Sequence, residues 1–206
     1  MFNEKEFDQW VNEYDDMVDR TAKVNKFPFA GYYDVLDDIY NEIIKKPNAS
    51  VLDLGFGTAK LTSRLYDYGC LIYGQDYSSN MIELASSKMP NAKLFQGDFS
   101  NGLVDSLSNN KYDFIISTYA LHHLTNENKV SFIKSLLKLL NDDGKIIIGD
   151  ITFNKQEELD ICKAQAKDDW DAEESYFVID DLKQIFPNLS FKKKSFCAGV
   201  LIIPSK

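Results

Sequence analysis

The stretch VLDLGFGTAKLT, residues 51–62, decides the fold of this chain. An apolar run, interrupted only by Asp53, ends at Gly55 and Gly57, and a helical spacing of leucines begins at Leu61. This order predicts a buried strand, a tight turn and a helix. Glycine has no Cβ and the first N–H groups of a helix lack partners, so such a turn can bring bare main chain up to a ligand. A turn that needs glycine for steric reasons alone would have the same sequence pattern, so the residues at the ends of the neighbouring strands must distinguish the two interpretations.

Alternating strands and helices follow this turn. Four further short apolar runs lie at residues 71–74, 93–95, 114–117 and 145–149, each with a helical or turn-rich stretch beside it. The clearest helix is predicted from an N-cap at Thr125 through Leu140 to a stop at Gly144. Strands separated in this way predict a parallel sheet covered by helices on both faces, which is an α/β fold. Residues 189–206 add two closely spaced strands, which predict an antiparallel hairpin.

The 206 residues fit one domain in three parts. Apolar residues at helical spacing from Phe7 to Val18 and from Tyr33 to Ile43 predict two helices before the first strand. We expect an N-terminal helical lid, a ligand-binding core, and a C-terminal part with helices and the closing hairpin, at residues 1–46, 47–150 and 151–206.

Composition excludes several classes of protein. A net charge of −9 opposes binding to nucleic-acid phosphates and anionic membranes. No apolar run approaches the roughly 20 residues that span a bilayer, and the acidic N-terminus is unlike a targeting peptide. Three widely spaced cysteines, Cys70, Cys162 and Cys197, fit neither a disulfide framework nor a zinc pattern, so we expect reduced thiols. These features predict a cytoplasmic protein with no nucleic-acid or membrane partner; they leave the oligomeric state open.

The ends of the predicted strands carry polar and aromatic residues. The second strand ends in Asp76, which can accept hydrogen bonds from both hydroxyls of an adenosine ribose. Capping of the next helix is the alternative, although Ser78 is better placed for it. The third strand ends at Asp98 and Phe99, suited to an exocyclic amine and a purine face, and the fourth ends near Ser117. Because parallel strands open on one edge of a sheet, these residues together predict an adenosine slot.

Five segments of residues 51–150 resemble consecutive motifs of class I S-adenosylmethionine-dependent methyltransferases: VLDLGFGTA, YGQDYSSNMIELA, GDF, YDFIISTYALHHL and LNDDGKIIIGD. The resemblance implies a three-layer Rossmann-like fold with a mostly parallel seven-stranded sheet, order 3-2-1-4-5-7-6 with strand 7 antiparallel. It implies S-adenosylmethionine as cofactor and S-adenosylhomocysteine as product. Asp53, Gly55 and Gly57 would then surround the methionyl part, Asp76 the ribose, and Asp98 and Phe99 the adenine. The full set of expected cofactor-binding residues is Asp53, Gly55, Phe56, Gly57, Asp76, Tyr77, Asp98, Phe99 and Ser117.

Departures from related patterns narrow the function. Ala59 stands where many members of the family have a third glycine, and Lys60 breaks the G-x-G-x-x-G pattern of nicotinamide dehydrogenases. Residues 118–120 lack the Asn-Pro-Pro-Tyr element of enzymes that methylate amide or adenine nitrogens. We therefore expect methyl transfer to a small-molecule acceptor by in-line displacement. A catalytically silent S-adenosylmethionine sensor or partner protein, and an aminopropyl transferase, are the alternatives.

No catalytic side chain is assigned from the sequence. His122 and His123, the only histidines, follow the fourth strand and suit either a general base or local capping and stacking. Asp150 could join them around a metal, but helix capping or solvation suffices to explain an Asp at a strand end, so no metal is predicted.

Aromatic residues outside the sheet are expected to form the acceptor lid or the core beneath it. Trp10 and Tyr14 of the first helix are candidates for the lid, and the resemblance implies that Tyr14 closes over the methionine end of the cofactor. His122, just after the fourth strand, is a candidate substrate contact. Segment 27–33 and three later aromatics, Trp170, Tyr176 and Phe177, have the same two interpretations. The acidic run KDDWDAEE at 167–174 is expected to be solvated helix surface.

Overall fold

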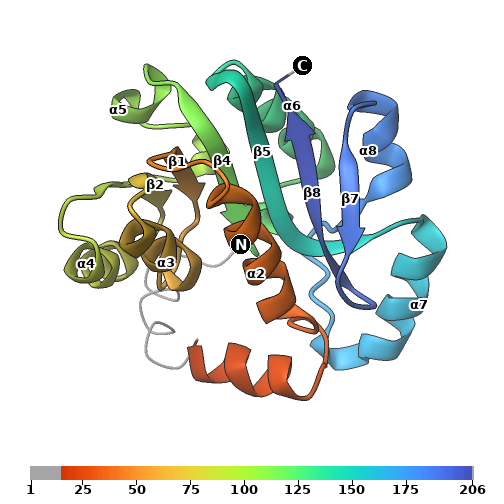
Figure 1. Ribbon diagram of the computed structural model, residues 1–206. Helices are drawn as coiled ribbons and strands as arrows, with labels where there is room; N and C mark the ends of the chain where they lie inside the picture. Colours follow the sequence, from red (N-terminus) through yellow and green to blue (C-terminus); the bar gives the residue numbers. More distant parts are fainter. Residues whose placement is uncertain (1–14, 206) are drawn as a thin grey trace.

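The computed structural model describes residues 15–205, which form a sheet covered by helices (Figure 1). A helix covers residues 15–23. The later helices are α2 Tyr32–Ile43, α3 Lys60–Tyr68, α4 Ser79–Lys88, α5 Asp105–Ser108, α6 Asn126–Leu137, α7 Gln156–Ala166 and α8 Ile179–Ile185, with 3₁₀ turns η1 Phe99–Asn101, η2 Leu121–His123 and η3 Lys167–Asp169. The strands are β1 Ser50–Leu54, β2 Leu71–Asp76, β3 Lys93–Gln96, β4 Tyr112–Thr118, β5 Leu140–Phe153, β6 Phe177–Val178, β7 Ser190–Lys193 and β8 Ala198–Pro204.

The sheet has the strand order β3-β2-β1-β4-β5-β8-β7. The strands β1 to β5 run parallel, whereas β8 is antiparallel to both β5 and β7. This order and the antiparallel hairpin confirm the seven-stranded arrangement expected from the sequence. The short strand β6, which pairs in parallel with the last residues of β5, is an addition that the sequence did not predict.

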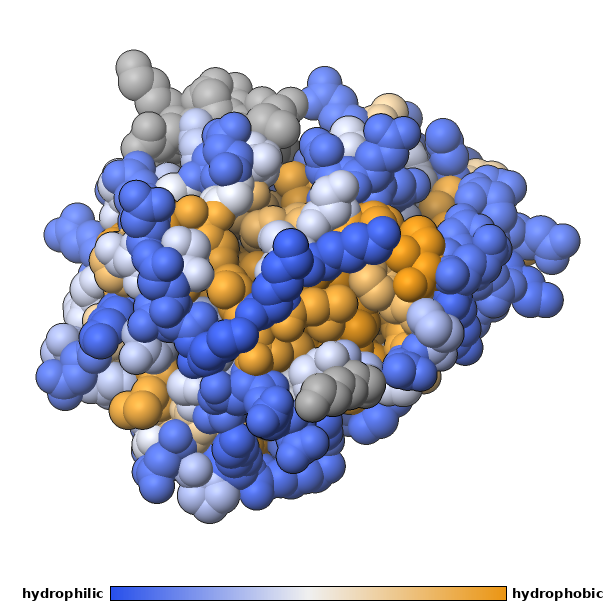
Figure 2. Space-filling model, turned by 90° about the horizontal axis from the view of Figure 1, so that it is seen from above, coloured by the Kyte–Doolittle hydropathy of each residue, from blue (hydrophilic) through white to orange (hydrophobic). Residues whose placement is uncertain are grey.

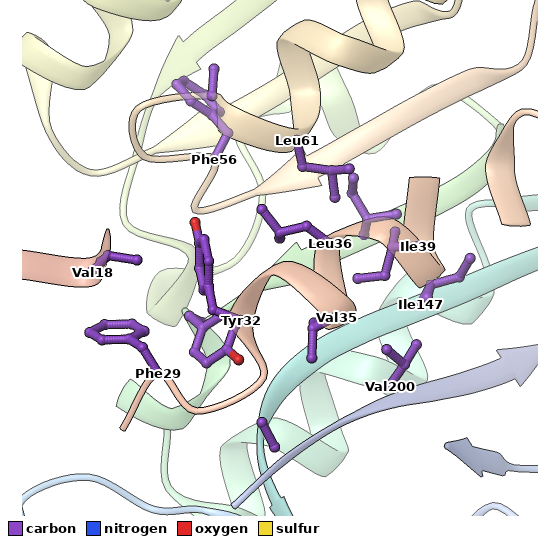
Figure 3. Close-up of a cluster of buried hydrophobic side chains, with 14 of the residues drawn as sticks. Val18, Phe29, Tyr32, Val35, Leu36, Ile39, Phe56, Leu61, Ile147 and Val200 are labelled. Carbon is purple, nitrogen blue, oxygen red and sulfur yellow. The ribbon is translucent and has the colours of Figure 1, made fainter. Parts of the chain in front are cut away.

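Two apolar layers cover the sheet because its strands are buried on both faces. On one face, residues such as Ile147 of β5 and Val200 of β8 pack against α2, α3, α4 and α7. Figure 3 shows Val35 and Ile39 of α2 beside these strand residues. On the other face, alternate residues such as Ile148 pack against α5, α6 and α8. The three-layer α/β architecture is therefore confirmed.

Several element boundaries differ from the prediction. Helix α6 ends at Leu137, and Leu140 instead starts β5, where it pairs with Tyr112 of β4. A leucine at this position satisfies the helical period and the strand equally well, so periodicity misplaced the end of the helix. Strand β5 continues past the predicted Gly149 to Phe153. Helix α7 stops at Ala166, short of Trp170, because Lys167 takes a left-handed φ of 49°.

The cysteines are free and buried, as expected for reduced thiols. No helix within residues 15–205 combines the length and apolarity needed to cross a membrane. Figure 2 looks down on the amino ends of the parallel strands, where hydrophilic residues surround a central group of hydrophobic ones. The candidate site lies at the opposite edge of the sheet.

Candidate active site

A cavity of about 520 Å³ lies at the carboxyl ends of the parallel strands. Its wall includes residues at or just after the carboxyl ends of β1, β2, β3 and β4, among them Gly55, Asp76, Asp98 and Thr118. The helix at residues 15–23 and the start of α2 lie beside the same edge (Figure 1). Four strand ends therefore meet at one cavity, as the parallel topology requires.

The turn after β1 has an alternating left-handed backbone. Gly55, Gly57 and Ala59 have φ values of 72°, 52° and 61°. A Cβ at Gly55 would lie 2.6 Å from the Cβ of Ala120, whereas a Cβ at Gly57 would meet no heavy atom within 4 Å. Gly55 is thus required by close packing, and Gly57 leaves bare main chain in the cavity wall.

Asp76 connects the ends of β1 and β2. Its Oδ2 accepts a hydrogen bond from the Gly57 N–H at 2.8 Å, and its Oδ1 accepts one from the Ser78 N–H at 3.0 Å. Burial raises the pKa of this carboxyl group. The hydroxyl of Ser78 caps α4 by accepting from the Met81 N–H, so Asp76 is not the cap of that helix. The carboxylate also interacts with the Tyr77 N–H, and it lines the cavity, where it can accept a hydrogen bond from a ligand.

Asp98, Phe99 and Tyr77 also lie in the cavity wall. Asp98 caps η1 by accepting from the Ser100 N–H at 2.8 Å. The ring of Phe99 stacks on Phe132 of α6, with centroids 5.9 Å apart and planes at 18°. This stacking holds one flat aromatic face at a fixed place in the wall.

Aromatic side chains form another part of the wall. The rings of Phe29, Tyr32 and Tyr119 form a cluster with centroid separations of 5.1 to 5.8 Å. Figure 3 shows Phe29 and Tyr32 facing Val18 of the N-terminal helix. Segment 27–33 therefore contributes to both the cavity wall and the hydrophobic core, which are the two roles that its sequence allowed.

A polar cluster lines the same cavity near η2. The Nδ1–H of His122 donates to Asp150 Oδ1 at 2.7 Å. Its Nε2 lies 3.4 Å from Glu174 Oε1, and His123 Nδ1 lies 3.7 Å from the same oxygen. Glu174 Oε2 accepts a hydrogen bond from the Tyr176 hydroxyl at 2.8 Å. Side chains from β5, η2 and segment 171–176 thus meet at one point.

Comparison with known proteins identifies the family. Residues 51–144 match a methyltransferase domain family. An uncharacterized methyltransferase of Bacillus mycoides is 37% identical over 162 residues, which are 78% of this chain and 73% of the relative. Another, from Bacillus cytotoxicus, is 38% identical over the same proportions of the two chains. This chain is a class I S-adenosylmethionine-dependent methyltransferase.

Solved structures share the fold of this methyltransferase. Magnesium protoporphyrin IX methyltransferase of Synechocystis, solved with bound S-adenosylhomocysteine, aligns with a TM-score of 0.70 at 19% identity and covers 96% of each chain. A TehB-like S-adenosylmethionine-dependent methyltransferase of Corynebacterium glutamicum aligns with a TM-score of 0.58 at 18% identity, covering 93% of this chain and 96% of its own. At these identities the likeness concerns the fold.

Two expected cofactor-binding residues of the methyltransferase lie beneath the cavity wall. Asp53 is buried and accepts a hydrogen bond from the hydroxyl of Thr62 in α3, and burial raises its pKa to about 7. The Ser117 hydroxyl donates to the Leu54 carbonyl at 2.8 Å. Both side chains hold the strands and α3 that carry the glycine turn. The other expected cofactor residues, Gly55, Phe56, Gly57, Asp76, Tyr77, Asp98 and Phe99, line the cavity.

Two acidic residues of the polar cluster differ from expectation. Asp150 is fully buried inside β5, so it is neither a helix cap nor a solvated strand end. Glu174 faces the histidines from an irregular segment, so its assignment to a solvated helix surface is wrong. Nothing local in the sequence marks these contacts, because they join residues 28 and 52 positions apart. Trp10 and Tyr14 lie outside the described residues.

Charge interactions set the protonation of this cluster. Burial lowers the pKa of His122, but the Asp150 carboxylate outweighs it, and the net pKa of His122 is raised. Burial likewise opposes ionisation of Asp150, yet its pKa is lowered by His122. The pKa of His123 is lowered to about 4 by burial and by the neighbouring imidazole, whose ring centroid is 4.3 Å away.

Lys60, which breaks the dinucleotide pattern, has a structural role in the methyltransferase. Its Nζ lies 2.6 Å from Asp19 Oδ1. The Thr58 hydroxyl similarly donates to Asp15 Oδ1 at 2.8 Å. The turn that follows β1 therefore contacts the helix at residues 15–23 through these two interactions. They join residues 41 and 43 positions apart, so the sequence motif alone did not predict them.

Proposed function

We propose that this methyltransferase transfers the methyl group of S-adenosylmethionine to a small molecule that binds in the same cavity. One observation carries the proposal: the glycine turn and Asp76 share a single cavity of about 520 Å³ with the aromatic wall and the polar cluster. Pockets for small molecules typically have volumes of about 300 to 1,000 Å³, so this cavity has a size that suits such ligands.

The residues present fit the cofactor. Gly57 exposes main chain at a point where an added Cβ would meet no heavy atom within 4 Å, which leaves room for a close ligand. Asp76 carries the lone pairs that ribose hydroxyls require, and Asp98 and Phe99 supply an acceptor and an aromatic face for the adenine. Phe56 and Tyr77 complete the expected contacts. Asp53 and Ser117 act indirectly, by holding the strand and helix beneath the turn.

Bound S-adenosylmethionine supplies an electrophilic methyl group on a sulfonium, so the protein needs no nucleophilic side chain. Its task is to align the acceptor with the methyl carbon and sulfur and to exclude water. The ring cluster of Phe29, Tyr32 and Tyr119 provides a rigid apolar wall for this purpose. The polar cluster around His122 is the part of the cavity suited to a proton-bearing acceptor group.

The proposal is tested first by binding. Cofactor or S-adenosylhomocysteine at about 100 times its dissociation constant adds about 2.7 kcal/mol of stability. At about 2–4 °C per kcal/mol for a chain of this size, the melting temperature should rise by about 5–11 °C. Asp76→Ala should abolish the rise. The matched control is Asp67→Ala, on the exposed side of α3, which should retain it. An undiminished rise in Asp76→Ala would refute the ribose assignment.

Turnover tests the second half of the proposal. A panel of small hydroxyl, thiol and amine compounds is incubated with enzyme and S-adenosylmethionine, and S-adenosylhomocysteine is measured. Production that depends on one chemical class supports methyl transfer to a small acceptor. Cofactor binding without turnover on any class would instead favour a sensor or partner protein.

A further inference from the structure

The polar cluster contains the only two histidines of the chain, together with Glu174. One ligand atom from each of His122, His123 and Glu174 lies within 4.8 Å of the others. We propose that these three side chains bind a divalent transition-metal ion of the zinc class, which in turn binds the methyl acceptor. The metal site stands on its own geometry; only its role toward an acceptor rests on the proposed function.

The ligand set fits such an ion. His122 Nε2 and His123 Nδ1 lie 3.4 and 3.7 Å from Glu174 Oε1, separations close to those between neighbouring ligands in a tetrahedral site. Two imidazole nitrogens and one carboxylate suit zinc and related first-row metals, whereas magnesium and calcium prefer oxygen ligands. Three protein ligands also leave a coordination position for a substrate atom.

Neighbouring carboxylate and hydroxyl groups orient two of the three ligands. Asp150 accepts the Nδ1–H of His122, so in the neutral imidazole the Nε2 lone pair points toward Glu174. The Tyr176 hydroxyl holds Glu174 Oε2 and leaves Oε1 directed at the histidines. A carboxylate behind a metal-binding histidine is the usual arrangement in metal sites, where it fixes the ring and raises its basicity.

The cluster also carries two carboxylates, Asp150 and Glu174. The nearby Lys129 Nζ donates to the Ser175 carbonyl. A divalent ion held by the three proposed ligands would lie close to both carboxylates, and opposite charges at short range attract. All three proposed ligands line the cavity and can be reached from it.

A metal at this position selects an acceptor class. A hydroxyl or thiol group that occupied its open position would have a lowered pKa and would lose its proton to water near neutral pH. The acceptor atom would then carry the lone pair that forms a bond to the methyl carbon, while the carbon–sulfur bond breaks and its electron pair leaves on the sulfur of S-adenosylhomocysteine. We therefore infer an acceptor with an ionisable oxygen or sulfur rather than a simple amine.

Zinc binding by the tag-free, chelator-treated protein tests the site directly. Zinc alone is titrated against a competing indicator, and imidazole ¹⁵N resonances are followed by NMR, where the whole chain contributes only two rings. We expect one equivalent to bind and both rings to shift. Glu174→Gln and His123→Ala should each weaken binding at least tenfold. Glu173→Gln, a matched change at the exposed neighbouring residue, should not.

Two results would overturn the metal site. One is a zinc dissociation constant above about 100 µM for the wild-type protein, which would mean that His122 and Asp150 form a histidine–carboxylate pair that binds no metal. The other is undiminished binding in both variants while their circular dichroism stays native. The S-adenosylhomocysteine melting shift, measured on the same samples, separates the two proposals: its presence without zinc binding removes only the metal site, and its absence with intact zinc binding removes only the cofactor assignment.

Discussion

Replacing Gly55 by alanine should destabilise the protein more than the same change at Gly57. Both glycines have left-handed backbone, with φ values of 72° and 52°, so alanine costs about 1–2 kcal/mol at either position. At Gly55 the new methyl group would also lie 2.6 Å from the Ala120 Cβ and 3.4 Å from Phe99 Cε1. Such overpacking adds about 1–3 kcal/mol. At Gly57 no atom lies within 4 Å, so only the backbone cost remains.

The difference between Gly55→Ala and Gly57→Ala is therefore expected to be about 2 kcal/mol in the free energy of unfolding. It should be measured by urea unfolding of both ligand-free variants, with equal slopes required so that the two midpoints can be compared. In thermal melts it corresponds to about 4–8 °C. Equal losses in the two variants, or a larger loss at Gly57, would refute the contact between the turn and Ala120.

Three further changes test the packing and the charges. Ala59→Gly should stabilise the protein by about 0.5–1 kcal/mol in urea unfolding, because Ala59 holds a φ of 61°; destabilisation would show that its buried methyl group matters more than the backbone. Burial raises the pKa of Asp53 to about 7, so the folded state binds this proton more tightly than the unfolded state does. The free energy of unfolding should therefore fall as the pH rises from about 3.8 to 7. Asp53→Asn should remove that fall, and an unchanged pH profile would contradict the burial argument. Glu42 should change stability with pH in the opposite direction, because the hydrogen bond from Lys145 lowers its pKa to about 2. Its contribution to the free energy of unfolding is present above pH 4.5 or so and is lost as the pH falls toward about 2. Glu42→Gln should therefore flatten the acid side of the same pH profile.

Local sequence patterns predicted the sheet and one half of the site. Apolar runs that end in glycine or an acid are local signals, and they placed β1, β2 and the turn between Gly55 and Gly57 correctly. Parallel topology then brought Asp76, Asp98 and Phe99 to one edge, because strand ends of a parallel sheet cannot do otherwise. These inferences needed no knowledge of distant contacts.

The other half of the site depends on packing between distant segments. Asp150 looks like a strand end in the sequence, but β5 continues past it and buries it against His122. Glu174 sits in an acidic run of ordinary composition, and only the path of the chain after η3 turns it toward the histidines. Side-chain direction also mattered: Asp53 and Ser117 belong to the expected strands, yet they point into neighbouring elements instead of the cavity.

The two halves of the cavity are built from separate stretches of chain. Residues at the carboxyl ends of β1, β2 and β3 form one half, whereas η2 and residues of segment 169–176 contribute to the other. Substitutions in segment 171–176 touch no backbone pairing of β1, β2 or β3. Under the proposed function, changes in this segment would alter which compound is methylated and leave the cofactor-binding half unchanged, so exchanging the segment between relatives is a route to engineered selectivity.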